Sequence, residues 1–183
     1  MEDLGPPRQG DNMAKNAGKQ FEEDIKASIP KTQDFFYYRF IDNAASFSGG
    51  DNVRFASHNL CDCMTMTKDK LYLMELKSHK GASLPLSAIR KNQIEGMAKV
   101  NHPKMKAIFI INFRDKEKTY AIEAKELQKY IETSSRKSIP ISFLEEVGTE
   151  IEAHKKKVNY IYNLEKYFEE DKASEDKYNW RFT

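Results

Sequence analysis

Three side chains near the middle of the sequence have the types and the spacing for metal-assisted cleavage of a phosphodiester. Asp62 lies in the run Cys61-Asp-Cys-Met-Thr-Met-Thr67, and Glu75 and Lys77 lie in the run Lys70-Leu-Tyr-Leu-Met-Glu-Leu-Lys77. The two runs predict β-strands, and the two residues between them predict a tight hairpin turn. Counted back from that turn, Asp62 lies opposite Glu75.

Directly opposed strand positions place their Cβ atoms about 4.5–5.5 Å apart on one face of a sheet, so both carboxylates could hold one divalent cation. Lys77 follows Glu75 by two residues and therefore points to the same face. We expect Asp62, Glu75 and the main-chain carbonyl of Leu76 to bind Mg²⁺. Lys77 would then orient the attacking water or stabilise developing negative charge.

The alternative is an ordinary hairpin whose acidic and basic side chains form exposed cross-strand ion pairs, which contribute little to stability. Glu75 and Lys77, however, lie in a strand that is otherwise apolar, with Leu71, Leu73 and Leu76 beside them. Unpaired charge in such a strand is costly unless it serves a purpose. This context favours a functional site.

The composition describes one domain of ordinary size. The chain has 183 residues, a net charge of +2 and 32% charged residues, and no apolar run approaches the roughly 20 residues of a membrane helix. The first residues lack the basic start and apolar stretch of a secretory signal. We therefore expect a cytoplasmic protein with no membrane partner.

Positive charge is concentrated in one part of the chain. Residues 68–106 contain nine Lys or Arg against three acids, a local excess of six positive charges. Such a stretch would attract a phosphate backbone, and within it we expect Lys80, Arg90 and Lys91 to contact DNA. A solvated helix face has the same composition.

Cys61 and Cys63 flank Asp62, and strand alternation predicts that both thiols point away from its carboxylate. Small buried core residues are the expected role. A zinc site recruiting His58 or His79 is the alternative, but a Cys-x-Cys pair alone is a weak zinc signal.

The predicted elements give an α/β fold, with a mixed β-sheet flanked by helices. Apolar periodicity predicts helices over 17–29, 87–100, 124–133 and 159–170, and strands over 35–41, 61–67, 70–77, 107–113 and 119–122. We expect a flexible N-terminal arm over 1–15, a nuclease domain over 16–170 with a protruding stalk or loop at about 43–59, and a charged C-terminal tail over 171–183.

Several of these segments resemble RecU, the Holliday junction resolvase family of Gram-positive bacteria and their phages. The resemblance covers roughly residues 16–135 and rests on Asp62, on Glu75-Leu-Lys77, and on two further segments, Ser83-Leu-Pro-Leu86 and Asn92-Gln-Ile-Glu-Gly-Met97. Gly18-Lys-Gln-Phe-Glu22 is similar to the Gly-x-x-x-Glu that opens the first helix of RecU and of archaeal junction resolvases.

The resemblance implies further site residues. Glu22 would be an additional acidic residue, although a first-turn Glu is also favoured by the helix dipole and Glu23 is its neighbour. Gln93 would lie near the site; on periodicity alone it is either that or a partly exposed border residue. Lys15 and Lys19 would represent the family's basic arm, and Phe47 and Arg54, in the place of its stalk, would contact the branch point.

A RecU-like protein is expected to have the restriction-endonuclease-like fold, to use Mg²⁺ or Mn²⁺, and to resolve four-way junctions as a homodimer by paired symmetric nicks. The segment 43–59 is shorter and richer in Gly than the family's stalk, and the N-terminal arm has few basic residues. Two alternatives are therefore kept. One is a nuclease of the same fold acting on other DNA in restriction or repair, and the other is a non-catalytic DNA-binding protein.

Overall fold

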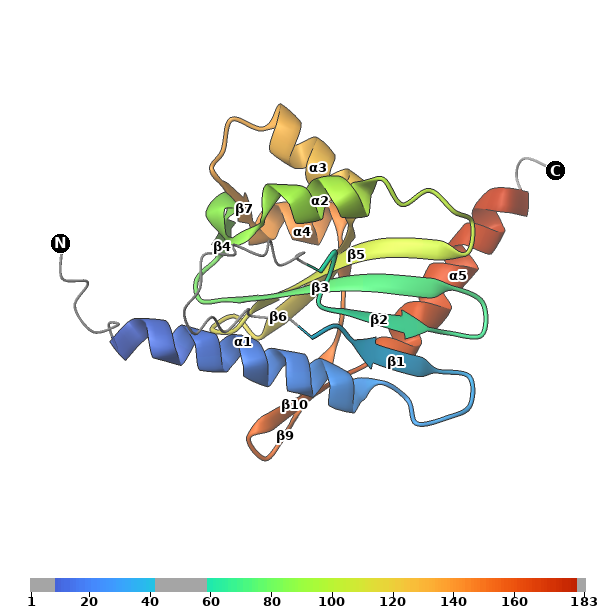
Figure 1. Cartoon of the computed structure of the whole chain (residues 1–183), viewed down its shortest axis with the longest axis horizontal. Coiled ribbons are helices and arrows are strands. Elements are labelled where there is room, and N and C mark those ends of the chain that lie inside the picture. Colours follow the sequence, from blue (N-terminus) through green and yellow to red (C-terminus); the bar gives the residue numbers. More distant parts are fainter. Residues whose placement is uncertain (1–8, 42–58, 181–183) are drawn as a thin grey trace, which may run out of the picture.

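A six-stranded mixed sheet forms the centre of the computed structural model, which describes residues 9–41 and 59–180, with the side chains of 17–41 and 59–174 (Figure 1). The strand order is β1-β2-β3-β5-β6-β8. The bounds are β1 Phe36–Arg39, β2 Cys63–Met66, β3 Leu71–His79, β5 Met105–Phe113, β6 Lys118–Glu123 and β8 Thr149–Glu150. Only β3 and β5 pair in parallel; the other described neighbours are antiparallel.

Helices cover the two faces of this sheet and form two separate cores. On one face lie α2 (Lys91–Ala98), α3 (Ala124–Thr133) and α4 (Ile141–Val147), which pack on the odd-numbered residues of β5. On the other face lie α1 (Gln9–Ser28) and α5 (Leu164–Trp180), which pack on the even-numbered residues (Figure 1). The near-continuous apolar run of β5 is explained by this burial on both sides.

Two small two-stranded sheets complete the fold. β4 (Ser83–Pro85) pairs with β7 (Ser138–Pro140) and is followed by the 3₁₀ turn η1 (Leu86–Ala88). β9 (Ala153–Lys156) pairs with β10 (Asn159–Tyr162) beside α1. Within the described residues, no helix is long and apolar enough to span a bilayer.

The structure confirms most of the predicted elements and corrects one. The mixed sheet flanked by helices is present, and the helix expected over 124–133 has those bounds. The helix expected over 159–170 is wrong in its first part, because residues 159–162 form strand β10 and α5 begins only at Leu164. Asn163 separates the two elements.

The expected segment boundaries also fall inside helices. Helix α1 begins at Gln9, within the expected arm, and α5 continues to Trp180, beyond the boundary placed at residue 171. Asp171 fixes α5 to the sheet: its carboxylate accepts a hydrogen bond from the Tyr72 hydroxyl at 2.7 Å and is paired with Lys70 and Lys106. Because these ionic groups are largely buried, the helix is held by more than apolar contact.

Candidate active site

The β2–β3 hairpin has the register expected from the sequence. Cys63 pairs with Met74 and Met66 pairs with Leu71, which places Asp62 opposite Glu75 one residue beyond the end of β2. Asp62 Oδ2 accepts a hydrogen bond of 2.8 Å from the Leu76 main-chain N–H. A side chain thus continues the ladder where the strand pairing stops, and this contact holds the Asp62 carboxylate against the middle of β3.

Glu75 is fully buried, with 0% of its surface exposed. Lys77 Nζ lies 2.6 Å from its Oε1 as an ion pair, and otherwise neither carboxylate oxygen has a hydrogen-bond partner in the described part of the chain. Burial and, after it, the charge of Asp62 raise the pKa of Glu75, Lys77 and Arg90 lower it, and the net result is a shift from 4.5 to about 7. A buried carboxylate with so few donors is a costly arrangement in a folded protein.

A divalent cation between Asp62 and Glu75 would relieve both costs, because it neutralises the repulsion and supplies the missing partner. The donor set fits Mg²⁺, which takes one or two carboxylates and keeps several waters. The described residues contain no cluster of three or more His, Cys, Asp and Glu side chains. The expected role of the Leu76 carbonyl as a further ligand remains a prediction.

The site lies on the sheet face covered by α2. Glu75 pairs with Phe109 and Lys77 with Ile111, and these two β5 residues share a core with Ile94 and Met97 of α2. Leu60, two residues before Asp62, contacts the same helix: its side chain lies so close to Gly96 of α2 that a Cβ added there would come within 2.6 Å of it. Tertiary contacts therefore place α2 next to the two carboxylates.

Gln93 is buried in α2, with 4% of its surface exposed. The interpretation of Gln93 as a partly exposed border residue is therefore wrong. Its Oε1 has no hydrogen-bond partner in the described residues. A buried, unsatisfied amide oxygen on the helix that covers the site agrees with a polar role there, which stays a prediction.

The structure describes Glu22 and one of its partners. Glu22 is on α1, where its carboxylate pairs with Arg39 of β1, which also contacts Glu23 Oε1 at 3.3 Å. The structure thus brings Asp62, Glu75 and Lys77 together, and the expected site role of Glu22 remains a prediction. Arg39 was missed by the sequence analysis; the signal was a charge next to aromatic residues in a strand.

The two cysteines are buried and unlinked, as expected for core residues, but they do not point the same way. Cys61 packs with the α2 layer, whereas Cys63 packs with the α1 layer, because Cys61 precedes the regular strand. Burial and then the charge of Glu75 raise the pKa of the Cys61 thiol to about 12. The zinc alternative gains no support from His79, which joins no metal-ligand cluster in the described residues, and His58 lies outside them.

The structure describes the side chains of only some of the residues that are expected to contact DNA. Lys19, Lys80, Arg90 and Lys91 are exposed, and the charge of Arg90 acts on Glu75. The Lys15 side chain, Phe47 and Arg54 lie outside the described residues. The basic stretch 68–106 is not one continuous patch.

Two lysines of the stretch 68–106 are largely buried and form ion pairs within the protein. Lys70 and Lys106 form ion pairs with Asp171 of α5, and Lys106 also lies 2.7 Å from Glu123 Oε1. The interpretation of the whole stretch as a DNA-facing patch is therefore wrong for these two residues.

The mixed sheet with helices on both faces is an α/β fold, and its adjacent strands carry an Asp and a Glu-x-Lys. The model of one family, Recombination protein U (RecU), matches residues 14–166. The chain belongs to this family.

Two similar proteins illustrate the relationship. A SPbeta prophage-derived uncharacterized protein, YotM, of Bacillus subtilis is 34% identical over 170 residues, covering 84% of this chain and 85% of the relative. The solved structure of Hjc from Archaeoglobus fulgidus, described as a Holliday junction resolvase from an archaeal hyperthermophile, is 18% identical with a TM-score of 0.46, covering 73% of this chain and 95% of that one.

Proposed function

We propose that this protein is a divalent-metal-dependent endonuclease that resolves four-way (Holliday) DNA junctions by paired symmetric nicks, acting as a homodimer. The observation that carries the catalytic part is Glu75, fully buried with almost no hydrogen-bond partners beside Asp62 and Lys77. Membership of the Recombination protein U family supports the junction as substrate.

Asp62 and Glu75 would hold Mg²⁺, or Mn²⁺ in its place, and the ion would supply Lewis-acid activation of the phosphate and of a water. The protein's own groups then have distinct tasks. Asp62 is oriented by the Leu76 N–H, and Lys77 stabilises negative charge on the phosphate oxygens, since its ammonium is fixed at 2.6 Å from Glu75. Glu22 and Gln93 are proposed as additional site residues.

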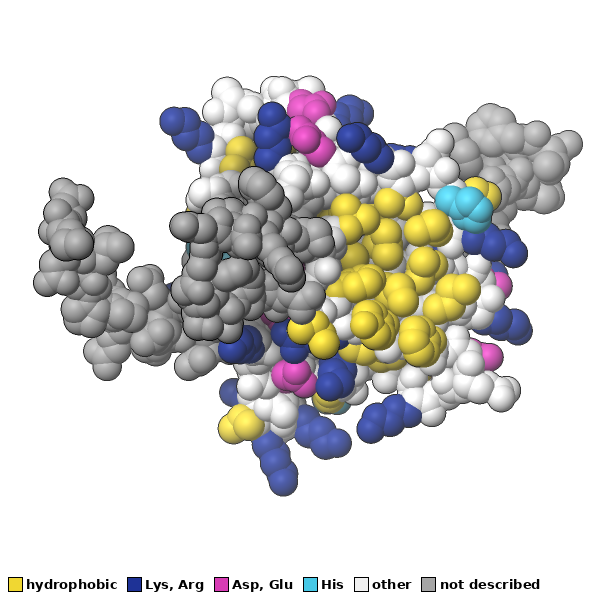
Figure 2. All heavy atoms as spheres, in the orientation of Figure 1, with side chains coloured by type: hydrophobic (Ala, Val, Ile, Leu, Met, Phe, Trp, Pro, Cys, Tyr) yellow, Lys and Arg dark blue, Asp and Glu magenta, His cyan; other side chains and the backbone are white. Residues whose placement is uncertain are grey.

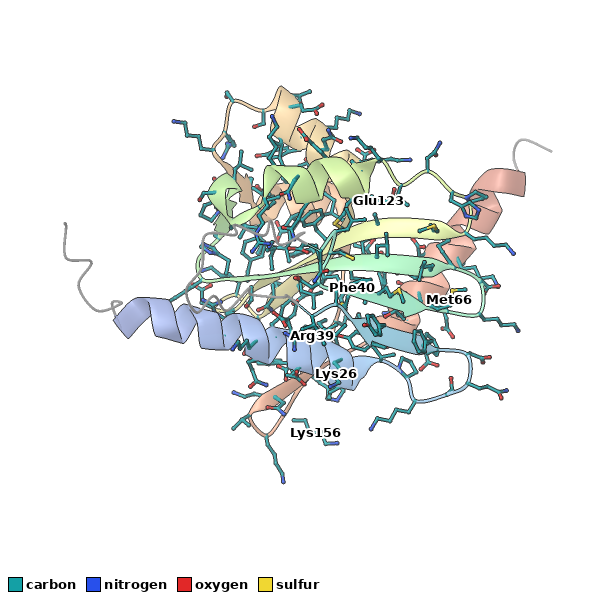
Figure 3. The ribbon with its side chains drawn as sticks, in the orientation of Figure 1. Lys26, Arg39, Phe40, Met66, Glu123 and Lys156 are labelled. Atoms are coloured by element: carbon teal, nitrogen blue, oxygen red, sulfur yellow. The ribbon has the colours of Figure 1, made fainter. Side chains whose placement is uncertain are left out.

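The homodimer is supported by an uncovered part of the sheet. On the face that carries Glu75, helices α2–α4 cover the β5 side, but Phe36, Tyr38 and Met66 of β1 and β2 are 57%, 46% and 48% exposed. Figure 2 shows a broad hydrophobic surface in this region with no charged side chain inside it. We call Phe36, Tyr38, Met64 and Met66 the apolar β1–β2 face; Figure 3 labels Met66 within it.

A second copy of the chain is the partner that this face fits best. Half-exposed aromatic side chains offer about 100 Å² each, so the apolar β1–β2 face and its exposed neighbours supply several hundred Å², enough for the apolar core of a standard interface of about 800 Å² per partner. β1 is also an edge strand, whose open hydrogen-bonding groups favour pairing. The four residues of this face offer DNA no cation, and a paired cut needs two sites related by symmetry.

Cleavage of a labelled four-way junction beside a linear duplex of the same sequence tests the function. We expect metal-dependent, symmetric nicks at the junction, no product in EDTA, and no product from Asp62→Asn with its fold intact. Equal cutting of the linear duplex would replace the substrate by other DNA, whereas tight junction binding without any product would indicate the non-catalytic alternative.

Light scattering tests the dimer separately. The double variant Phe36→Lys with Met66→Lys should be monomeric at concentrations where the natural protein is a dimer, because two cations would be buried in the interface. Val147→Lys is the matched control, since Val147 is 43% exposed on α4 outside this face. A monomeric natural protein, or an unchanged dimer in the double variant, would contradict the assignment of this face.

A further inference from the structure

The β9–β10 hairpin projects from the body of the molecule and carries a compact positive charge. Figure 1 shows it beyond α1, away from α2 and α3, and Figure 3 labels Lys156 near its end. Asn159 pairs with Lys156 and Tyr162 with Ala153, so Lys157 and Val158 form a two-residue turn. We call residues 153–162 the basic ribbon.

The three consecutive lysines of the basic ribbon, Lys155, Lys156 and Lys157, are all exposed. The ribbon contains no Asp or Glu, and none of the three forms an ion pair with any residue that the structure describes. Other exposed lysines do have acidic partners, as Lys166 does with Glu152 at 3.1 Å. Lys155 Nζ lies 6.0 Å from the centre of the Tyr160 ring, but like charges that are held together without acids repel, so the grouping as a whole adds little to the stability of the fold.

The turn itself is an unfavourable choice for folding. Lys157 has a φ of 61°, in the left-handed region where a two-residue hairpin normally places Gly or Asn. A side chain there costs on the order of 1 kcal/mol. Val158, the other turn residue, is 82% exposed, so its apolar surface is not buried by the described part of this chain. A cation and an apolar group are thus presented together at the tip.

The base of the ribbon, in contrast, is firmly attached to α1. The Tyr160 N–H donates to Asp24 Oδ2 at 3.2 Å, and the Tyr162 N–H donates to Ser28 Oγ at 2.9 Å. The buried Tyr162 ring also meets the Phe21 ring edge-on at 5.5 Å between centroids. A fixed base with a charged tip suits a contact with a large partner rather than a local structural role.

We propose that the basic ribbon is a second DNA-contacting element, which binds the sugar–phosphate backbone of a duplex arm of the substrate. A two-stranded ribbon has the width to lie along a groove of duplex DNA, with lysine ammonium groups on phosphates and Val158 against the sugar edges. It reads no bases. The inference rests on the proposed function only in taking duplex DNA as the substrate.

Salt-dependent binding tests the ribbon independently of cleavage. Binding of a fluorescent duplex and of a four-way junction would be measured by anisotropy without metal, in the Asp62→Asn background, from about 50 to 200 mM KCl. The triple variant Lys155→Gln, Lys156→Gln and Lys157→Gln should lower the slope of log affinity against log salt by about 0.9 for each phosphate that is no longer neutralised, two to three in total. If the two affinities converge at 1 M salt, this slope change weakens binding roughly 60- to 500-fold near 0.1 M.

The matched control removes the same charge from the opposite side of the sheet. Lys125, Lys129 and Lys137 are exposed on and after α3, and their triple Gln variant should change the slope by less than about one unit. A ribbon variant with the natural slope, or a control variant with an equal decrease, would overturn the proposal. Neither result bears on whether the natural protein nicks junctions in Mg²⁺, so the two proposals fail separately.

A second ribbon variant removes folding as an explanation. Lys157→Gly relieves the left-handed backbone position and should increase the thermal midpoint of unfolding, yet it should lower the salt slope by about one. A stabilised Lys157→Gly protein with unchanged binding would show that Lys157 contacts no phosphate and would contradict the proposed contact at the tip.

Discussion

Replacing Glu75 with Gln should stabilise the metal-free protein at neutral and alkaline pH while it removes one of the two carboxylates of the proposed metal site. The isosteric amide keeps the shape of the side chain but carries no charge into a fully buried position. In the natural protein, burial and the charge of Asp62 disfavour the ionised form of Glu75, and Lys77 compensates for this only in part. The net result is a rise in the pKa of Glu75 from 4.5 to about 7.

The size of the effect follows from this pKa. Between pH 4.5 and 7 the folded state holds a proton on Glu75 that the unfolded state has released, so the free energy of unfolding falls as pH rises through this window. The loss is below about 1 kcal/mol at pH 5 and reaches about 3 kcal/mol at pH 8. The Glu75→Gln protein lacks this contribution, so its free energy of unfolding should exceed that of the natural protein by an amount that grows by about 2 kcal/mol between these pH values.

Urea unfolding in EDTA at a series of pH values measures this difference directly. Glu95→Gln is the control, because Glu95 is partly exposed and paired with Lys91 at 3.7 Å, and its replacement should give no such pH-dependent gain. Added Mg²⁺ at pH 8 should raise the free energy of unfolding of the natural protein more than that of Glu75→Gln. A constant difference between Glu75→Gln and the natural protein across pH would refute the reasoning from buried charge.

Two further expectations concern the frame that holds the site. Asp171→Ala should lower the free energy of unfolding by about 3 kcal/mol, because it removes the buried carboxylate that pairs with Lys70 and Lys106 and so holds α5 on the sheet. Urea unfolding followed by near-ultraviolet circular dichroism would measure this loss. Gly148→Ala should cost about 1–3 kcal/mol, since a Cβ would meet the Leu144 carbonyl oxygen at 2.7 Å; Gly18→Ala, with nothing within 4 Å of the added Cβ, should instead stabilise α1 by about 0.5–1 kcal/mol. Equal effects of the two Gly substitutions on the thermal midpoint would contradict this assignment.

Short-range rules were sufficient for some elements of this chain and not for others. The β2–β3 register was predictable because a two-residue turn and strand alternation are both short-range, and together they fix which residues oppose each other. The error over 159–170 has the opposite cause. Ile161, Leu164 and Phe168 fit a helical stripe, but pairing with β9 and packing on α1 make the first of them part of a strand.

The sequence by itself determined the arrangement of the proposed catalytic residues: Asp62 opposite Glu75, with Lys77 on the same face, follows from chain neighbours and from the period of a strand. Only the tertiary structure decided the chemistry of that arrangement. The parallel pairing of β3 with β5 and the position of α2 bury Glu75 and shift its pKa. The packing of α1 beside β1 brings Glu22 into an ion pair with Arg39. The physical reason is that the dielectric environment and the charge partners of a side chain depend on segments far away in sequence, which no local pattern encodes.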